Sequence, residues 1–212
     1  MLGSKGRRSG GPAGNASGDP WRERSRTAIR RESEAVMMAV PIRLYGDPVL
    51  RERSRQVESF DGELRALAEE MIDSMRTGEG IGLAAPQIGV RLRVIVVEAD
   101  AVGEEALEPR VLVNPEIVEF SDTEVAYEEG CLSIPEVRAD VVRPDEIRLR
   151  YRTLAGEPVE ERAAGLYARV LQHEIDHLDG RLFIDRIGVV ERSQFRKKLR
   201  EIQKRSVEIA KA

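Results

Sequence analysis

The sequence predicts an α+β domain in which mostly antiparallel strands pack around a central, buried helix that carries a His-Glu-x-x-His motif. Apolar, β-branched segments follow one another between residues 93 and 152 with only short turns between them. That pattern is typical of antiparallel sheets rather than of strand–helix–strand units. The segment from 164 to 180 is apolar around most of its helical circumference, which is typical of a buried helix.

The composition fits a single globular domain. The 212 residues are 34% charged and 41% hydrophobic, enough for one domain with its own core. No run of about 18 apolar residues occurs, so no membrane span is predicted. The net charge of −4 names no partner, and we predict no specific DNA partner. The single cysteine excludes an internal disulfide and favours a reducing compartment, so we expect a cytoplasmic protein.

Residues 1–38 are predicted to be a disordered N-terminal extension, because they are rich in Gly, Ser, Pro and Arg and lack apolar periodicity. They contain no apolar core of a secretory signal. Their Arg and Ser content is similar to that of organellar transit peptides, but four acidic residues argue against import: Asp19, Glu23, Glu32 and Glu34. Translation from Met37 or Met38 is an alternative hypothesis that would leave the extension untranslated. We expect residues 39–190 to form the main domain.

The elements of that domain follow from periodicity and turn residues. Residues 41–56 are expected to be extended, and a helix is predicted over 62–76 with Asp61 as its N-cap. The predicted strands cover 93–98, 109–120, 125–128, 137–143 and 146–152, and a turn follows at 155–157. The motif helix spans 164–180, a short connection spans 181–187, and a final helix covers 190–210. Residues 191–212 would thus add a basic C-terminal helix to the same domain.

A glycine-rich stretch, Gly80-Ile-Gly-Leu-Ala-Ala-Pro-Gln-Ile-Gly89, lies between the first predicted helix and the first strand. Its small residues indicate a close approach of the backbone to another segment or to a ligand. It matches neither a phosphate-binding loop nor a dinucleotide fingerprint. From composition alone, a tight structural loop and a functional site explain it equally well.

Both histidines of the chain belong to His173-Glu-Ile-Asp-His177. Positions i and i+4 share one helix face, so two imidazoles can bind one metal ion with a carboxylate beside them. A catalytic site of this kind needs a third protein ligand. The position that supplies a third His in extended metalloprotease motifs is Phe183 here, while downstream glutamates remain available: Glu191, Glu201 and Glu208. A lone cysteine is usually a small buried hydrophobe, but Cys131 would complete a Cys-His-His set.

Three stretches together resemble the signature motifs of the peptide deformylase family: residues 80–89, Glu129-Gly-Cys-Leu-Ser-Ile-Pro135 and Gln172-His-Glu-Ile-Asp-His-Leu-Asp-Gly180. The resemblance implies that residues 39–190 are a catalytic domain that removes the formyl group from the N-terminal formyl-methionine of nascent polypeptides. It also implies a cytoplasmic enzyme of the bacterial type. It implies one divalent metal ion, Fe²⁺ in cells, replaceable by Zn²⁺, Ni²⁺ or Co²⁺. The alternative is a metallopeptidase of another kind that uses the same helix.

The resemblance also implies roles for single residues. Cys131, His173 and His177 would bind the metal, Glu174 would act as general base and then acid, and Gln87 with the backbone N–H of Leu132 would hold the formyl oxygen. The chemistry fits each role. Residues expected to contact the substrate are Ile81, Gly82, Glu129, Gly130, Leu166, Arg169 and Val170.

Three finer expectations accompany these roles. The stem of Arg169 would line the methionine pocket while its charged head reaches solvent. Glu79 and Arg143 would form a supporting ion pair. The basic residues after 190 either contact ribosomal RNA or form a solvated helix face.

Overall fold

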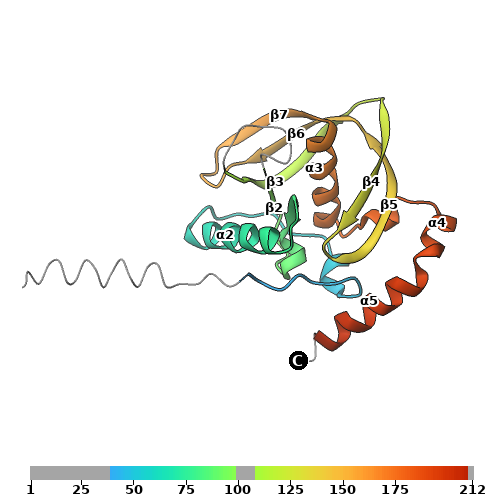
Figure 1. Cartoon of the computed structure of the whole chain (residues 1–212). Coiled ribbons are helices and arrows are strands. Elements are labelled where there is room, and N and C mark those ends of the chain that lie inside the picture. Colours follow the sequence, from blue (N-terminus) through green and yellow to red (C-terminus); the bar gives the residue numbers. More distant parts are fainter. Residues whose placement is uncertain (1–38, 99–107, 210–212) are drawn as a thin grey trace, which may run out of the picture. The chain divides into compact units, whose positions relative to one another are not determined.

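The computed structural model describes residues 39–98 and 108–209 (Figure 1). The predicted N-terminal extension lies outside this part of the chain. All pairings between the strands of the described residues are antiparallel, which confirms the α+β class with antiparallel strands. No helix of the described residues is long and apolar enough to cross a membrane.

The helices and strands alternate along the chain as follows. The helical elements are the 3₁₀ helix η1 (Pro48–Arg51), α2 (Gly62–Thr77), η2 (Ala85–Ile88), α3 (Gly165–Leu178), η4 (Phe183–Asp185), α4 (Val189–Gln194) and α5 (Arg196–Ile209). The strands are β1 (Gly82–Ala84), β2 (Val94–Val97), β3 (Arg110–Phe120), β4 (Glu124–Cys131), β5 (Ile134–Pro144), β6 (Glu146–Arg152) and β7 (Pro158–Ala164).

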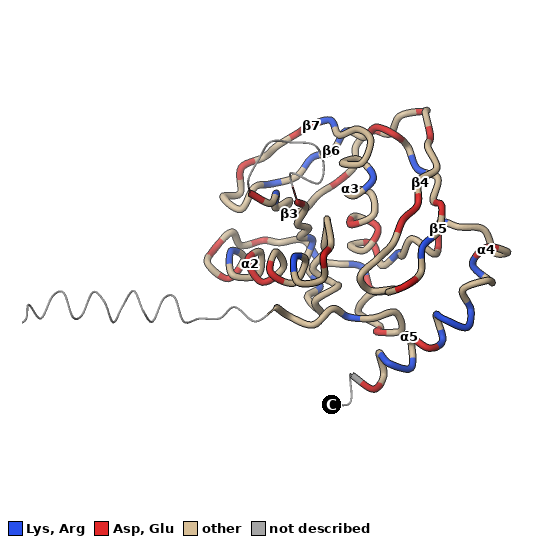
Figure 2. The backbone as a smooth tube through the Cα atoms, in the orientation of Figure 1, with Lys and Arg blue, Asp and Glu red and all other residues tan. Residues whose placement is uncertain are grey.

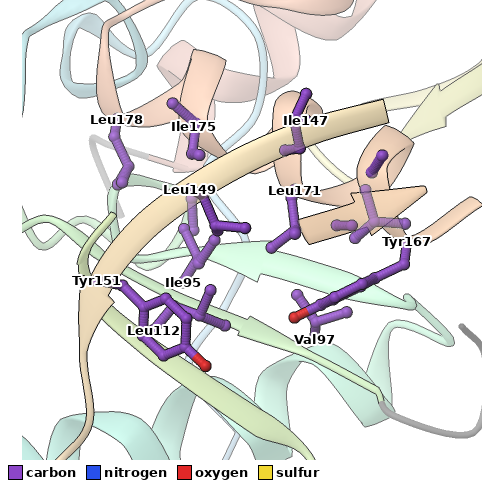
Figure 3. Packing of buried hydrophobic residues seen from close by; sticks show 14 residues of the cluster. Ile95, Val97, Leu112, Ile147, Leu149, Tyr151, Tyr167, Leu171, Ile175 and Leu178 are labelled. Carbon is purple, nitrogen blue, oxygen red and sulfur yellow. The ribbon is translucent and has the colours of Figure 1, made fainter. Parts of the chain in front are cut away.

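A five-stranded sheet in the order β1-β2-β3-β6-β7 separates two helices. Strand β2 is buried along its whole length because both of its faces are covered. Val94 and Val96 pack in one cluster with Met71 of α2, while Ile95 packs in another with Leu171 of α3. Figure 3 shows this second cluster, in which α3 side chains lie against the sheet. Alternation along one strand thus places α2 and α3 on opposite faces.

A separate two-stranded sheet, β4–β5, carries Cys131 at its turn, where Cys131 pairs with Ile134. Such a hairpin is only marginally stable by itself. Its buried residues, including Val141, pack with Phe183 of η4 and Ile202 of α5. The hairpin therefore depends on the C-terminal elements and on α3 for its position.

Three elements differ from the sequence-based expectation. The turn at 155–157 leads into β7, which we did not predict because Val159 is its single β-branched residue and three of its seven residues are charged. The final helix is two helices that meet at Phe195, a residue packed against the hairpin cluster. The glycine-rich stretch, for which a tight structural loop was one of two interpretations, contains β1 and η2.

Candidate active site

Three side chains that can bind a metal ion meet where α3 faces the turn of the β4–β5 hairpin. The ligand atoms of Cys131, His173 and His177 all lie within 4.8 Å of one another, the only such group among the described residues. The Sγ atom of Cys131 is 3.3 Å from Nε2 of His177. Both histidines lie on α3, which is buried along nearly all of its length.

The donor set and the electrostatics of this cluster suit a cation. A thiolate with two imidazoles is a common ligand set for zinc and related ions. Burial lowers the pKa of His177 well below its usual value, and the charge of His173 lowers it further. The pKa of His173 lies well above its usual value: burial opposes this shift, and hydrogen bonds to Cys131 and Glu129 cause it. The surroundings thus favour a neutral imidazole at His177, the form that binds a metal ion.

A buried carboxylate fixes the orientation of one histidine. Nδ1 of His173 donates to Oε2 of Glu129 over 2.9 Å, which leaves Nε2 of His173 for an ion. Arg143 in turn donates to both carboxylate oxygens of Glu129, at 2.7 and 3.0 Å. Burial raises the pKa of Glu129, but the hydrogen bonds from His173 and Arg143 outweigh it and lower the pKa to about 2. Glu129 is therefore negatively charged at neutral pH.

Arg143 continues this network to the surface. Its Nη1 donates to Oδ2 of Asp176 over 2.6 Å, and Asp176 also accepts hydrogen bonds from the partly exposed Arg186. The expected ion pair between Glu79 and Arg143 is wrong, because Arg143 faces Glu129 and Asp176 instead. Sequence reasoning missed Asp176, although its place inside the motif helix was a usable signal.

Glu174 is the second acidic group of the site, and it differs from Glu129 in its hydrogen bonds and in its pKa. It is buried, and its Oε2 has no hydrogen-bond partner among the described residues. Burial raises the pKa of Glu174 to about 7. A carboxyl group with this pKa can both accept and donate a proton near neutral pH.

Strand β1 approaches Glu174 closely because residue 82 is glycine. A Cβ atom on Gly82 would lie 2.7 Å from Cγ1 of Val170 and 2.8 Å from Oε1 of Glu174, distances that are too short for real contacts. Gly82 thus lets the backbone of β1 lie against the side of α3 that bears Val170 and Glu174. This resolves the glycine-rich stretch as a close approach to the active site.

Replacing Gly82 with Ala should therefore lower kcat/KM by about 10²-fold, the cost of moving a reacting group by about 1 Å. The overpacked methyl group should also cost about 1–3 kcal/mol of stability. Steady-state formate release and thermal unfolding measure the two effects. Gly62→Ala is the matched control, because its Cβ would meet nothing within 4 Å. Equal activity of the two variants would contradict the role given to Gly82.

Gln87 points its amide nitrogen at the metal-binding cluster. Its Oε1 accepts from the N–H of Ala84 over 2.8 Å, which fixes the amide orientation. Its Nε2 lies 3.6 Å from Sγ of Cys131 and 3.4 Å from Oγ of Ser133. Leu132, the other residue expected to hold the formyl oxygen, occupies the same hairpin turn as Cys131. The structure therefore brings Gln87 to the cluster from η2 and Leu132 from the turn of the β4–β5 hairpin.

The residues expected to contact the substrate divide into two groups. Ile81 and Leu166 are exposed, at 41% and 39%, and Gly130 is also exposed. Val170 is buried against β1, beside Gly82. Of these positions, Val170 and Gly82 are the ones that the structure places beside Glu174.

Glu129 and Arg169 belong to the second group, because their polar groups face the protein interior. The carboxylate of Glu129 is fully engaged by its partners, as described above. The expectation that the head of Arg169 reaches solvent is wrong: the side chain is 8% exposed. Its guanidinium donates to Glu129 and to two backbone carbonyl oxygens.

Phe183 stands where extended metalloprotease motifs carry their third histidine, and the structure explains its presence there. Its ring is fully buried and stacks against His173, with ring centroids 6.1 Å apart. It therefore supports the imidazole by packing. The hairpin residue Cys131, and not residue 183, lies beside the two histidines as a candidate third ligand.

An α+β fold that holds a Cys-His-His cluster beside a buried glutamate and an oriented amide is typical of metal-dependent hydrolases. The family model of polypeptide deformylase matches residues 39–193. The peptide deformylase of Phenylobacterium zucineum is 51% identical over 154 residues, which are 73% of this chain and 90% of the relative. That of Picosynechococcus sp. is 50% identical over 149 residues, covering 69% and 79% of the two chains.

Solved structures agree with the sequence relatives. A plant peptide deformylase PDF1B superposes with a TM-score of 0.75 at 37% identity, covering 82% of this chain and 94% of that one. The Thermotoga maritima peptide deformylase gives a TM-score of 0.67 at 44% identity, with 71% and 99% covered. The chain belongs to the peptide deformylase family. It removes the N-formyl group from newly made polypeptides, and cleavage of internal peptide bonds is not favoured.

Proposed function

We propose that deformylation takes place at one divalent ion held by Cys131, His173 and His177, Fe²⁺ in cells, with Zn²⁺, Ni²⁺ or Co²⁺ able to replace it. The convergence of the three ligand atoms within 4.8 Å carries this proposal. The buried carboxylate behind His173 supports it, because such outer partners orient metal-binding imidazoles.

Each step of the reaction then has its own group in the chain. When bound, the ion supplies a Lewis acid that activates water and polarises the formyl carbonyl. Glu174 accepts the proton of the attacking water and later delivers it to the leaving amine, both of which its pKa of about 7 permits. The amide N–H of Gln87 and the backbone N–H of Leu132 hold the oxygen on which negative charge develops.

The peptide lies along the free edge of the five-stranded sheet in this proposal. β1 is the first strand in that sheet, so one of its edges is open to an added strand. Ile81 and Gly82 would pair with the substrate backbone, and Leu166 and Val170 would contact the methionine side chain. The closeness of Gly82 to Glu174 supports this path, because it brings the paired backbone to the base.

Removal of the metal tests the proposal. Stripping the protein with a chelator under anaerobic conditions should abolish formate release from formyl-Met-Ala, and reloading with Fe²⁺ or Co²⁺ should restore it. Metal analysis of the same samples should give one ion per chain. A peptide with a free N-terminus and an internal bond serves as control and should stay intact. Full activity of metal-free protein would refute the metal site.

We also propose that the protein works in the cytoplasm and that its basic C-terminal helix contacts ribosomal RNA. Figure 2 shows Lys and Arg recurring along α4 and α5. Lys197, Arg200 and Lys204 are all exposed. The opposite face of α5 packs against the hairpin through Leu199 and Ile202. Deleting the helix would therefore damage the core, so substitutions are the better test.

Reversing the charge of Lys197, Arg200 and Lys204 to Glu should weaken ribosome co-sedimentation. Losing three phosphate contacts should reduce the slope of log affinity against log salt by about 2 to 3. Reversal of the exposed Arg65 on α2 is the control. Unchanged ribosome binding by the triple variant would reject the RNA contact and leave a solvated helix face.

A further inference from the structure

Arg169 ties helix α3 to both strands of the β4–β5 hairpin. It lies four residues before His173, on the same face of α3 one turn earlier. Its Nη1 donates to the carbonyl oxygen of Val141 in β5 over 2.8 Å and to Oε1 of Glu129 in β4 over 3.1 Å. Its Nη2 donates to the carbonyl oxygen of Val125 in β4 over 2.6 Å. One buried guanidinium therefore joins three elements.

The position of this hairpin decides whether a metal site exists. Cys131 sits at the end of β4, whereas both imidazoles sit on α3, and a two-stranded hairpin does not hold its own position. Glu129 precedes Cys131 by two residues on the same strand, and its carboxylate contacts His173. The group that Arg169 contacts is thus the group that orients His173.

We infer that Arg169 is a positioning residue that locks the cysteine-bearing hairpin against the histidine-bearing helix, and so sets the affinity for the ion. This inference rests on the proposed metal site. It replaces the expectation that Arg169 lines the methionine pocket, because all of its polar contacts are on the hairpin side of α3. Arg143, on β5, also links the hairpin to α3 through Asp176, but its bonds go to side chains. Arg169 instead bonds backbone carbonyl oxygens of both hairpin strands, so the two links are distinct.

The chemistry of the guanidinium explains why arginine is needed. Methionine would fill a similar volume, but three acceptors would lose a donor, and one of the two buried acceptors is a carboxylate. Lysine keeps the charge but lacks the planar fork that reaches acceptors on two strands at once. The inference therefore predicts a graded loss, with Arg169→Lys between wild type and Arg169→Met.

Competition between the metal-free protein and a chromogenic chelator for Zn²⁺ and for Co²⁺ tests this. Arg169→Met should bind each ion about 10–100-fold more weakly than wild type, the usual cost of losing an outer partner. The Co²⁺-loaded variant should also show a weakened thiolate-to-cobalt absorption band. Arg93→Met is the matched control. Arg93 is 12% exposed and bonds Asp179 and the carbonyl oxygen of Pro115, away from the hairpin.

The possible outcomes distinguish failure of the role inferred for Arg169 from failure of the proposed metal site. The inference would be overturned if Arg169→Met bound the ions with wild-type affinity and kept the wild-type cobalt spectrum. A raised KM that varied with the first side chain of the substrate would then show that Arg169 lines the methionine pocket. Failure of the wild-type protein to bind either ion would overturn the metal site itself. If Arg169→Met does not fold, Arg169→Lys and Glu129→Gln replace it in the test. Both variants should then bind the ions more weakly than wild type. Unchanged ion affinity in the two would overturn the inference.

Discussion

Replacing Glu174 with Gln should lower kcat by about 10²- to 10⁴-fold, the usual contribution of a general base and acid, while ion binding stays intact. The amide is close in shape to the carboxyl group but cannot accept or deliver the proton. Its position is favourable for the test, because Oε2 of Glu174 makes no hydrogen bond within the described residues. No neighbour therefore loses a partner when that oxygen is changed.

Formate release under anaerobic conditions and metal analysis of the same sample measure the two effects. Glu63→Gln, on the exposed first turn of α2, is the matched control and should keep full activity. If Glu174→Gln retained the turnover of wild type, the assignment of the base would be wrong. If it lost the ion as well, its role would be structural.

Replacing Cys131 with Ala should abolish both ion binding and deformylation. Two imidazoles remain in this variant, but a catalytic centre of this type needs three protein ligands. Loss of an outer partner of a metal ligand costs about 10–100-fold in ion affinity. We expect the loss of Cys131 to lower the ion affinity by more than that. Cys131 lies at the hairpin turn and is only partly buried. Removal of its Sγ should therefore cost little stability.

Ion titration by chelator competition, with circular dichroism to monitor the fold, distinguishes these effects. Val142→Ala is the control, because Val142 lies on the same hairpin with its side chain 55% exposed. Cys131→Ser should give an intermediate result, since an oxygen ligand is harder and its proton is less acidic. Ion binding by Cys131→Ala at wild-type strength would exclude Cys131 from the ligand set.

The course of the main elements could be predicted because local patterns specify them. Periodicity located α2 and most strands to within a few residues, and Asp61 does cap α2 by accepting from the N–H groups of Glu63 and Leu64. The edge strand β7 escaped prediction because three consecutive charged residues, Glu160 to Arg162, interrupt any apolar alternation. Its partner β6, not its own propensity, holds it in the sheet.

The roles of the buried charged residues could not be read from local patterns. Glu129 and Arg169 were expected at the substrate, and Arg143 was expected to pair with Glu79. In the structure all three meet inside the protein, where Glu129 contacts Arg143, Arg169 and His173. Charged residues on a strand or helix usually face solvent, so a sequence gives no local sign that these are buried and paired.

By itself, the sequence determined which atoms can bind an ion, since the chain has two histidines and one cysteine, and it determined that both histidines share one helix face. Only the tertiary structure decided how Cys131 reaches them, because 42 residues separate it from His173 and the hairpin that carries it is placed by packing and by the buried arginines. Spacing along a helix is set by the covalent chain and by backbone hydrogen bonds. The distance between a helix and a hairpin is set by the side chains that pack between them. Local sequence patterns do not predict which side chains those are.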